Sequence, residues 1–278
     1  MRTVLVGKAS VWLINLGDLG FKLKDVESVP EDEWRLEYAD VFENVHPYPS
    51  QSVYISLPGL SVLVDAGDYS KFATPDSPYT IPGYKPPPTL IEQLSQIGIK
   101  KEDVDYVVIT HAHYDHYAGV TVETSEEFVP AFPNAAYLLG KQDYENPETQ
   151  KSLLDPNSEE SRTLGVLHRA RKLELVEKDR SISDEIEIIA SPGETEGHKI
   201  VRLHSGGETL YCVGDLFHHA CEVEHPSWMA SWDDPKSNLA SRHELLEKAS
   251  REDALLAPAH MPLGKVEKTS SGFRYVEV

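Results

Sequence analysis

Short apolar runs rich in β-branched residues recur along the chain, separated by polar and turn-forming segments. Such runs predict strands at residues 3–6, 11–15, 52–57, 60–65, 104–109, 136–139, 173–176, 186–190, 199–203, 210–213 and 255–257. Apolar residues spaced three or four positions apart predict helices at 90–98, 161–172 and 239–250. The sequence therefore predicts a chain in which strands and helices are mixed throughout.

Three further segments are predicted to be turns or loops. Gly17 to Gly20 reads as a turn that closes an opening hairpin or meander. Residues 26–48 are acidic and aromatic, and fit a solvated helix and a flap near a site equally well. Residues 74–89 are rich in proline and predict a long irregular loop of the kind that borders pockets.

Composition and charge narrow the class of protein. The 278 residues could form one large or two small domains. A formal net charge of -20 disfavours nucleic acid and anionic membranes as partners, because long-range attraction to phosphate is absent. Only Cys212 and Cys221 occur, which provides no disulfide framework, and no apolar window approaches the length of a membrane-spanning helix. We therefore expect a cytoplasmic protein.

The strongest chemical signal follows the apolar run at 104–109, where residues 110–116 read Thr-His-Ala-His-Tyr-Asp-His. A lone histidine at a strand end is usually an ordinary surface residue. Here His111, His113, Asp115 and His116 lie so close together that they would repel or crowd one another unless a cation held them. Imidazole and carboxylate are the ligands of zinc-like ions. The sequence therefore predicts a metal site directly after this strand.

Other candidate residues also follow predicted strands. Asp65 ends the run at 60–65, where it fits either turn chemistry or a role in orienting a metal ligand. The loop Ser191 to His198 separates two strands, Asp215 follows the run at 210–213, and His260 follows the run at 255–257. The repeated placement of polar side chains after strands indicates one shared edge.

Together these segments resemble the metallo-β-lactamase-fold hydrolase superfamily. The resemblance rests on motifs in the family's order that span most of the chain: Val62 to Gly67, His111 to His116, Pro192 to His198, Gly214-Asp215 and Pro258 to Pro262. It implies an α/β (α+β) fold, an αββα sandwich of two mixed β-sheets flanked by helices. It also implies one domain over residues 1–278, with pocket-lining loops at 24–50, 70–89 and 217–237.

The resemblance further implies a dinuclear site for two divalent ions, with zinc favoured and manganese or iron as alternatives. His111 and His113 would bind the first ion, and Asp115, His116 and His260 the second. Asp215 would bridge the two ions. Asp115 thus belongs to the expected catalytic centre as well as to the metal site, and a metal-bridging hydroxide would be the nucleophile.

One position departs from the family pattern. The third motif usually reads Pro-Gly-His-Thr-x-Gly-His, and Glu194 stands here in place of its first histidine. A carboxylate is an ordinary ligand for zinc, manganese and iron, so Glu194 is the favoured replacement. The alternatives are that His198 completes the first site, or that Glu194 is a solvated loop residue and a single ion binds.

The expected activity is hydrolysis of a lactone, an ester or a related small molecule. The run from His260 to Gly264 and its spacing from Arg242 and His243 resemble the lactonase and organophosphate-hydrolase branch. His218 stands where related lactonases carry a substrate-contacting tyrosine, so it is either a proton donor or an exposed or supporting histidine. Tyr114, Trp228 and Trp232 are candidate pocket walls.

Two other functions remain open at this stage. One is an iron-dependent thiol or persulfide oxidoreductase on the same fold, and the other is a metal-stabilised binding protein without turnover. The expected partner is a small-molecule substrate, without nucleic acid or membrane, and relatives suggest a homodimer by analogy.

Overall fold

Two seven-stranded sheets make up the centre of the protein in the computed structural model, which describes residues 1–74 and 76–278. The first sheet has the order β1-β2-β3-β4-β5-β8-β9 and the second the order β10-β11-β12-β13-β14-β15-β16. Neighbouring strands are parallel from β4 through β5 and β8 to β9, and again between β13 and β14, while the other pairs are antiparallel. Both sheets are therefore mixed.

The strands of the first sheet are β1 (Arg2–Val6), β2 (Ala9–Phe21), β3 (His46–Leu57), β4 (Leu60–Val64), β5 (Tyr106–Ile109), β8 (Ala136–Gly140) and β9 (Leu173–Val176). Those of the second are β10 (Arg180–Ser181), β11 (Ile186–Ala190), β12 (Lys199–Ser205), β13 (Glu208–Gly214), β14 (Leu255–Pro258), β15 (Gly264–Lys268) and β16 (Phe273–Glu277). A small hairpin consists of β6 (Thr121–Glu123) and β7 (Phe128–Pro130).

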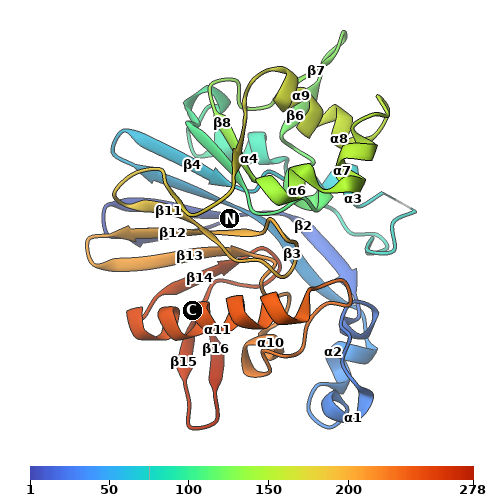
Figure 1. Ribbon diagram of the computed structural model, residues 1–278, viewed down its shortest axis with the longest axis vertical. Coiled ribbons are helices and arrows are strands. Elements are labelled where there is room, and N and C mark those ends of the chain that lie inside the picture. The colour runs from blue at the N-terminus through green and yellow to red at the C-terminus, as the bar shows by residue number, and fades with distance from the viewer. Residues whose placement is uncertain (75) are drawn as a thin grey trace.

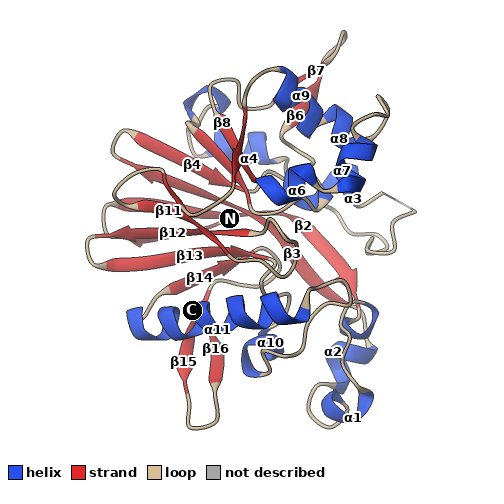
Figure 2. Cartoon of the chain, viewed as in Figure 1, coloured by secondary structure: helices blue, strands red, loops and turns tan. Residues whose placement is uncertain are grey.

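The helices connect these strands (Figure 2). They are α1 (Glu31–Trp34), α2 (Ala39–Glu43), α3 (Tyr69–Phe72), α4 (Leu90–Gln96), α5 (Tyr114–Tyr117), α6 (Lys141–Glu145), α7 (Pro147–Ser152), α8 (Glu159–Arg162), α9 (Leu164–Arg169), α10 (Ala220–Glu224) and α11 (Pro235–Glu252), with 3-10 turns at Leu23–Asp25 and Lys101–Asp103. Within the described residues, no helix combines the length and apolar character needed to cross a membrane.

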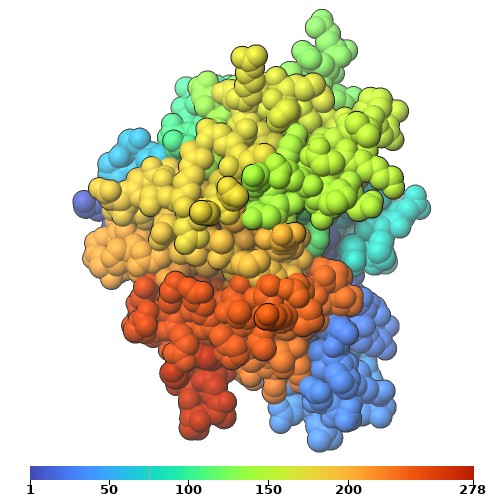
Figure 3. Space-filling view, in the orientation of Figure 1, coloured from blue at the N-terminus to red at the C-terminus, as the bar shows by residue number. Residues whose placement is uncertain are grey.

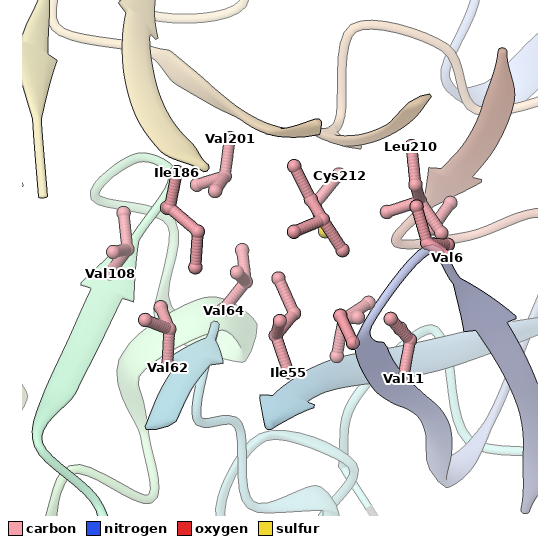
Figure 4. Packing of buried hydrophobic residues seen from close by; sticks show 14 of the residues in the cluster. Val6, Val11, Ile55, Val62, Val64, Val108, Ile186, Val201, Leu210 and Cys212 are labelled. Carbon is pink, nitrogen blue, oxygen red and sulfur yellow. The ribbon is translucent and has the colours of Figure 1, made fainter. Parts of the chain in front are cut away.

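Alternating side chains along each strand divide the core into layers. Val53, Ile55 and Leu57 of β3 point between the sheets, whereas Tyr54 packs on the opposite face against the helical layer. Figure 4 shows the layer between the sheets, where Val62 and Val64 of the first sheet approach side chains of the second. Burying aliphatic side chains from both sheets is the main favourable term that holds them together.

Helices cover the outer face of each sheet. Leu90 and Leu94 of α4 and Leu167 of α9 pack on the first sheet, and Leu245 and Leu246 of α11 pack on the second. Figure 1 shows α4 and α9 on one side of the strands and α11 on the other. The predicted αββα sandwich is confirmed.

The N-terminal third also packs against a distant part of the chain. Trp34 and Phe42 of the two short helices stack with ring centroids 4.8 Å apart, and Trp228 meets Phe42 edge to face at 5.8 Å. Figure 3 shows this N-terminal part, in blue, against the orange segment that includes α10. Residues 26–48 therefore form a helical flap that is anchored by its aromatic residues.

Several predicted elements differ from those observed. Gly17 to Gly20 is not a turn but part of β2, which bulges between Asn15 and Gly17 and continues beside β3. A Cβ at Gly17, where φ is +152, would lie 2.2 Å from the Tyr69 ring, so glycine here permits the close packing of that ring. The predicted helix at 161–172 is split at Thr163 into α8 and α9.

Strand direction explains where the candidate residues gather. Because β4 and β5 are parallel, Asp65 and Thr110 both leave the first sheet at the same edge. Because β13 and β14 are parallel, Asp215 and the segment leading to His260 leave the second sheet together. The parallel pairs therefore bring distant parts of the sequence to one edge of the sandwich.

Candidate metal centre

The histidine motif folds around a single point. His111 follows β5 and is fully buried, and the chain then turns into α5, whose first turn carries Asp115 and His116. His111 Nε2 and His113 Nδ1 lie 2.9 Å apart. Two ring nitrogens at this separation, together with a third histidine ring 4.1 Å from that of His111, show that the imidazoles converge.

Two groups of metal-binding side chains share one carboxylate. The first group contains His111, His113, Glu194 and Asp215, and the second contains Asp115, His116, Asp215 and His260; in each group the candidate ligand atoms lie within 4.8 Å of one another. Asp215 Oδ2 lies 3.2 Å from His116 Nε2, 3.2 Å from His260 Nε2 and 3.8 Å from His111 Nε2. Asp215 is therefore shared by the two groups.

The unpaired atoms of these groups fit divalent ions. Glu194 Oε2 and Asp215 Oδ1 are buried and have no hydrogen-bond partner among the described residues. A buried carboxylate oxygen without a partner is costly, and a cation removes that cost. Imidazole nitrogens and carboxylate oxygens in such a set suit zinc, and also manganese or iron.

Glu194 lies with the first histidine pair. Its Oε1 is 3.1 Å from His113 Nδ1 and 3.9 Å from His111 Nε2, and its side chain is fully buried. Glu194 is therefore not a solvated loop residue. His198 lies behind the pair: its Nδ1 is 3.0 Å from the Ser191 carbonyl oxygen, and it belongs to neither group. The geometry favours Glu194 over His198 as the third partner of the first site.

The segment before Asp215 brings these residues close together. Gly214 has φ +53, and a Cβ there would lie 2.7 Å from His198 Nε2 and 2.9 Å from Thr110. Only glycine fits this approach without displacing its neighbours. The backbone at the end of β13 can thus pass directly beneath the histidine motif and place Asp215 between the two groups.

Burial and mutual charge govern the ionisation of the centre. Burial lowers the pKa of His111 well below its ordinary value, and the charges on His116 and His113 act in the same direction. Burial also opposes charge on His116, but Asp215, Asp115 and Asp65 raise its pKa well above the ordinary value. His111 therefore tends to remain a neutral imidazole, the form that binds metal.

The carboxyl groups show the reverse pattern. Burial would raise the pKa of Asp215, yet the charges of His116 and His260 hold it well below the ordinary value. Burial also opposes charge on Glu194, while its hydrogen bond with His113 and the charge on His218 lower its pKa to about 2. Both groups are consequently carboxylates, the form in which they bind cations.

A second histidine-carboxylate arrangement lies beside the metal-binding groups. His218 Nε2 is 3.6 Å from Asp215 Oδ2, and His218 Nδ1 is 3.5 Å from Glu222 Oε1. Glu222 Oε2 accepts hydrogen bonds from the His218 backbone N–H at 2.7 Å and from Arg242 Nη2 at 3.1 Å. Glu27 completes this buried set, and its ligand atom lies within 4.8 Å of those of His218 and Glu222.

The two groups open into a cavity of about 410 Å³. Its walls combine apolar side chains from the N-terminal half with polar atoms of the centre, and its lining residues are Leu19, Phe21, Val26, Phe72, Ser77, Tyr79, His113, Tyr114, Asp115, Asp215, His218, Trp232 and His260. Each of the segments 24–50, 70–89 and 217–237 contributes residues to this lining. Within the segment 70–89, Pro75 lies outside the described residues. Trp228 does not line the cavity but is buried beneath the flap.

Several residues support the centre in ways that the sequence did not indicate: Trp232 was expected only as a pocket wall, and Asp233 was not expected at all. Trp232 Nε1 donates to Glu194 Oε1 at 2.7 Å, and Asp233 accepts from Asn238 Nδ2 at 2.5 Å. Burial raises the pKa of Asp233 to about 9, and the Glu194 carboxylate adds to that rise. Glu222 lies four residues after His218, but α10 begins only at Ala220, so a helical spacing rule does not account for their contact.

The comparisons with known proteins agree with this geometry. The family model described as the metallo-beta-lactamase superfamily matches residues 46–260. Among curated proteins, no sequence matches this chain.

Solved structures resemble the chain over nearly its full length. One is hydrolase AbOPH of the beta lactamase superfamily, with TM-score 0.80 and 18% identity, covering 99% of this chain and 96% of that one. A probable metal-dependent hydrolase from Staphylococcus aureus has TM-score 0.77 and 20% identity, covering 99% of each chain. AidC, a dizinc quorum-quenching lactonase in complex with a product, has TM-score 0.77 and 20% identity, covering 100% of this chain and 97% of its own.

At these identities the solved structures establish the fold, while the family model covers most of the chain, including the histidine motif and Asp215. The chain therefore belongs to the metallo-beta-lactamase superfamily, and it is a metal-dependent hydrolase of that superfamily.

Proposed function

We propose that this hydrolase acts on a small lactone or related ester that carries an apolar substituent. The observation that carries the proposal is the position of Asp215, which belongs to both metal-binding groups and also lines the largely apolar cavity. A carbonyl group placed at Asp215 would lie at the metal centre, and its apolar substituent would contact Phe21, Phe72 and Tyr79.

The residues divide into those that would hold the ions and those that would face the substrate. His111, His113 and Glu194 would hold the first ion, Asp115, His116 and His260 the second, and Asp215 both. When bound, two such ions supply Lewis-acid polarisation of the carbonyl oxygen and activation of water at neutral pH. Asp115 lines the cavity as well, so it serves the reacting centre as a ligand that borders substrate.

His218 is the proposed proton donor. It lines the cavity, and its Nε2 lies on the side of Asp215, where the reacting carbonyl would bind. Cleavage of a lactone or ester leaves an alkoxide oxygen that needs a proton, and an imidazole N–H at hydrogen-bond distance can supply it. Glu222 lies on the other side of the ring, with its Oε1 3.5 Å from His218 Nδ1, and is the proposed partner that orients it.

The structural relatives support this substrate class. AidC is described as a lactonase in complex with the product N-hexnoyl-L-homoserine. That product combines a carboxylate with a short acyl chain, which matches a metal centre next to an apolar cavity. The oxidoreductase and the non-catalytic binding protein gain no comparable support from the comparisons.

The test is a hydrolysis assay on metal-loaded protein. N-acyl homoserine lactones of graded chain length, simple lactones, aryl esters and phosphotriesters would be followed by acid release at constant pH. We expect lactone hydrolysis that disappears after chelation and returns when zinc, manganese or iron is restored. The H116A variant is the negative control, because it removes a ligand of the second site. Absence of turnover on every substrate class would overturn the proposal.

A further inference from the structure

We propose that Trp232 is a positioning residue that fixes the orientation of Glu194 and restricts that ligand position to a hydrogen-bond acceptor. The first metal site of this chain is then built for a carboxylate, not for the imidazole that the family pattern usually has there. This inference rests on the proposed function of the two groups as metal sites, and it names what determines the ligand in one of them.

The contact between the two residues is direct. Trp232 Nε1 donates to Glu194 Oε1 at 2.7 Å, a short hydrogen bond. The same oxygen lies 3.1 Å from His113 Nδ1, so it is held on the side where the first ion would bind. The Trp232 side chain is 45% exposed overall, yet its only polar atom points inward to a fully buried carboxylate.

Hydrogen-bond chemistry makes this contact selective. An indole Nε1–H can only donate, so its partner must be an acceptor. A carboxylate oxygen has two lone pairs and can accept from Trp232 while it binds a cation. A neutral histidine that binds metal through one nitrogen carries a proton on the other. A histidine at this position would thus have no lone pair free for the indole N–H, because one nitrogen binds the ion and the other carries a proton, and the indole donor would lose its partner.

Backbone contacts hold the loop that carries Glu194 against the segment that carries Trp232. Asp234 N–H donates to the Gly193 carbonyl at 2.9 Å, and Ser241 Oγ donates to the Pro192 carbonyl at 2.7 Å. A Cβ at Gly193, where φ is +146, would lie 2.3 Å from Asn238 Cα, so the loop and the start of α11 are in backbone contact. The loop that carries Glu194 and the segment that carries Trp232 therefore form one packed unit.

Other residues pack around Trp232 and hold it against the centre. Asp233 follows Trp232, is buried, and is held by Asn238 Nδ2 at 2.5 Å. The rings of His113 and His218 meet the Trp232 ring edge to face at centroid distances of 6.1 and 6.2 Å. The indole thus packs against both sides of the centre, and its orientation is set by packing as well as by the hydrogen bond.

The test combines W232F, E194H and the double variant W232F/E194H. W232F removes the donor and keeps an aromatic ring, and W12F is the matched control because Trp12 packs on the outer face of the first sheet. Metal equivalents would be measured by elemental analysis after dialysis. The affinity of each site would be measured by chelator competition, and the ligand set by the absorption spectrum of the cobalt(II)-substituted protein. Circular dichroism would check folding.

We expect the wild type and W12F to bind two equivalents. W232F should lower the affinity of the first site by about 10- to 100-fold, as loss of a hydrogen bond to a metal ligand typically does, and leave the second site unchanged. E194H should lose more affinity than W232F, and W232F/E194H should recover part of it, because the indole N–H that lacks an acceptor in E194H is then absent.

Unchanged affinity in W232F would overturn the inference, as would equal affinity of E194H with and without W232F. Either result could occur in a protein that still binds two ions and hydrolyses lactones, so the proposed function would stand. A wild type that binds no ion would overturn the proposed function and this inference with it. If E194H fails to fold, the comparison of W232F with W12F decides the inference alone.

Discussion

The Asp65 carboxylate contacts the His116 ring on the nitrogen that does not face Asp215. Asp65 Oδ2 lies 2.9 Å from His116 Nδ1, while His116 Nε2 lies 3.2 Å from Asp215 Oδ2. Asp65 also accepts from the Thr110 backbone N–H at 2.8 Å and adopts a positive φ of 57. A residue other than glycine seldom adopts this backbone conformation unless its surroundings hold it there. Asp65, at the end of β4, is therefore in direct contact with His116, a member of the second group of metal-binding side chains.

Replacing Asp65 should weaken metal binding. We expect D65N to lower the affinity of the second site by about 10- to 100-fold, because the amide offers one acceptor oxygen where the carboxylate offers two, one for the Thr110 N–H and one for the His116 ring. Chelator competition measures the metal affinity of the second site. D105N is the matched control: Asp105 accepts from Ser61 at the other end of the same strand pair, far from the centre. Equal losses in the two variants would show that Asp65 acts through general stability.

Replacing Glu222 should slow the reaction without removing metal. E222Q keeps the shape of the side chain but leaves Arg242 Nη2 without its charged partner and weakens the hold on His218. We expect kcat to fall by about 10- to 100-fold with two metal equivalents retained. E224Q is the control, since Glu224 accepts a hydrogen bond from the Tyr38 hydroxyl at the surface. A change confined to KM would contradict the positioning of His218 by Glu222.

The cavity should set the preference for apolar substituents. Phe72 lines it and is half-buried, so F72A removes apolar contact without opening the core. Each methylene buried is worth about 0.8 kcal/mol, so kcat/KM should rise with acyl length in the wild type and rise less in F72A. F128A is the control, because Phe128 lies on β7 under Arg162. If kcat/KM rose equally with acyl length in the wild type and in F72A, the apolar substituent would not contact Phe72.

Glu27 should make stability depend on pH. Burial raises the pKa of Glu27 well above its ordinary value, and the neighbouring Glu222 carboxylate adds to this. The folded state thus binds a proton more tightly than the unfolded state does. The resulting stability is fully present below the ordinary glutamate pKa and is lost as pH rises through the raised value. E27Q mimics the protonated acid and removes this dependence.

Urea unfolding at several pH values measures the effect. We expect the wild type to lose stability relative to E27Q as pH increases above the ordinary glutamate pKa. E31Q is the control, because Glu31 is exposed and pairs with Arg35 on one turn of α1. A constant difference between wild type and E27Q across the pH range would show that Glu27 is ionised in the folded state throughout.

The histidine motif and the residues after parallel strands could be predicted because their signals are local. The apolar run of β5, the spacing of His111 to His116 and the turn residue Gly214 can each be recognised within a few residues. The direction of the parallel pairs then brings Asp215 and His260 to the same edge. The sequence could therefore predict which residues meet, although it left Glu194 and His198 as alternatives.

The remaining features depend on contacts between distant segments. Gly17 to Gly20 is typical of a turn, but Tyr69 packs against Gly17 and β3 pairs alongside, so the strand continues. The helix predicted at 161–172 is interrupted because the Thr163 hydroxyl bonds the Glu159 carbonyl and closes the first turn. The hairpin of β15 and β16 was not predicted. Trp232 bonds Glu194 from 38 residues away, which no local pattern indicates.

The proposed reaction requires two ions, bound by the two groups that share Asp215. Anomalous scattering at the zinc, manganese and iron absorption edges, recorded on crystals of protein that hydrolyses a lactone, tests this claim. We expect two peaks, one contacted by His111, His113 and Glu194 and the other by Asp115, His116 and His260, with Asp215 between them. An active protein with a single peak, or with peaks away from these residues, would contradict the account.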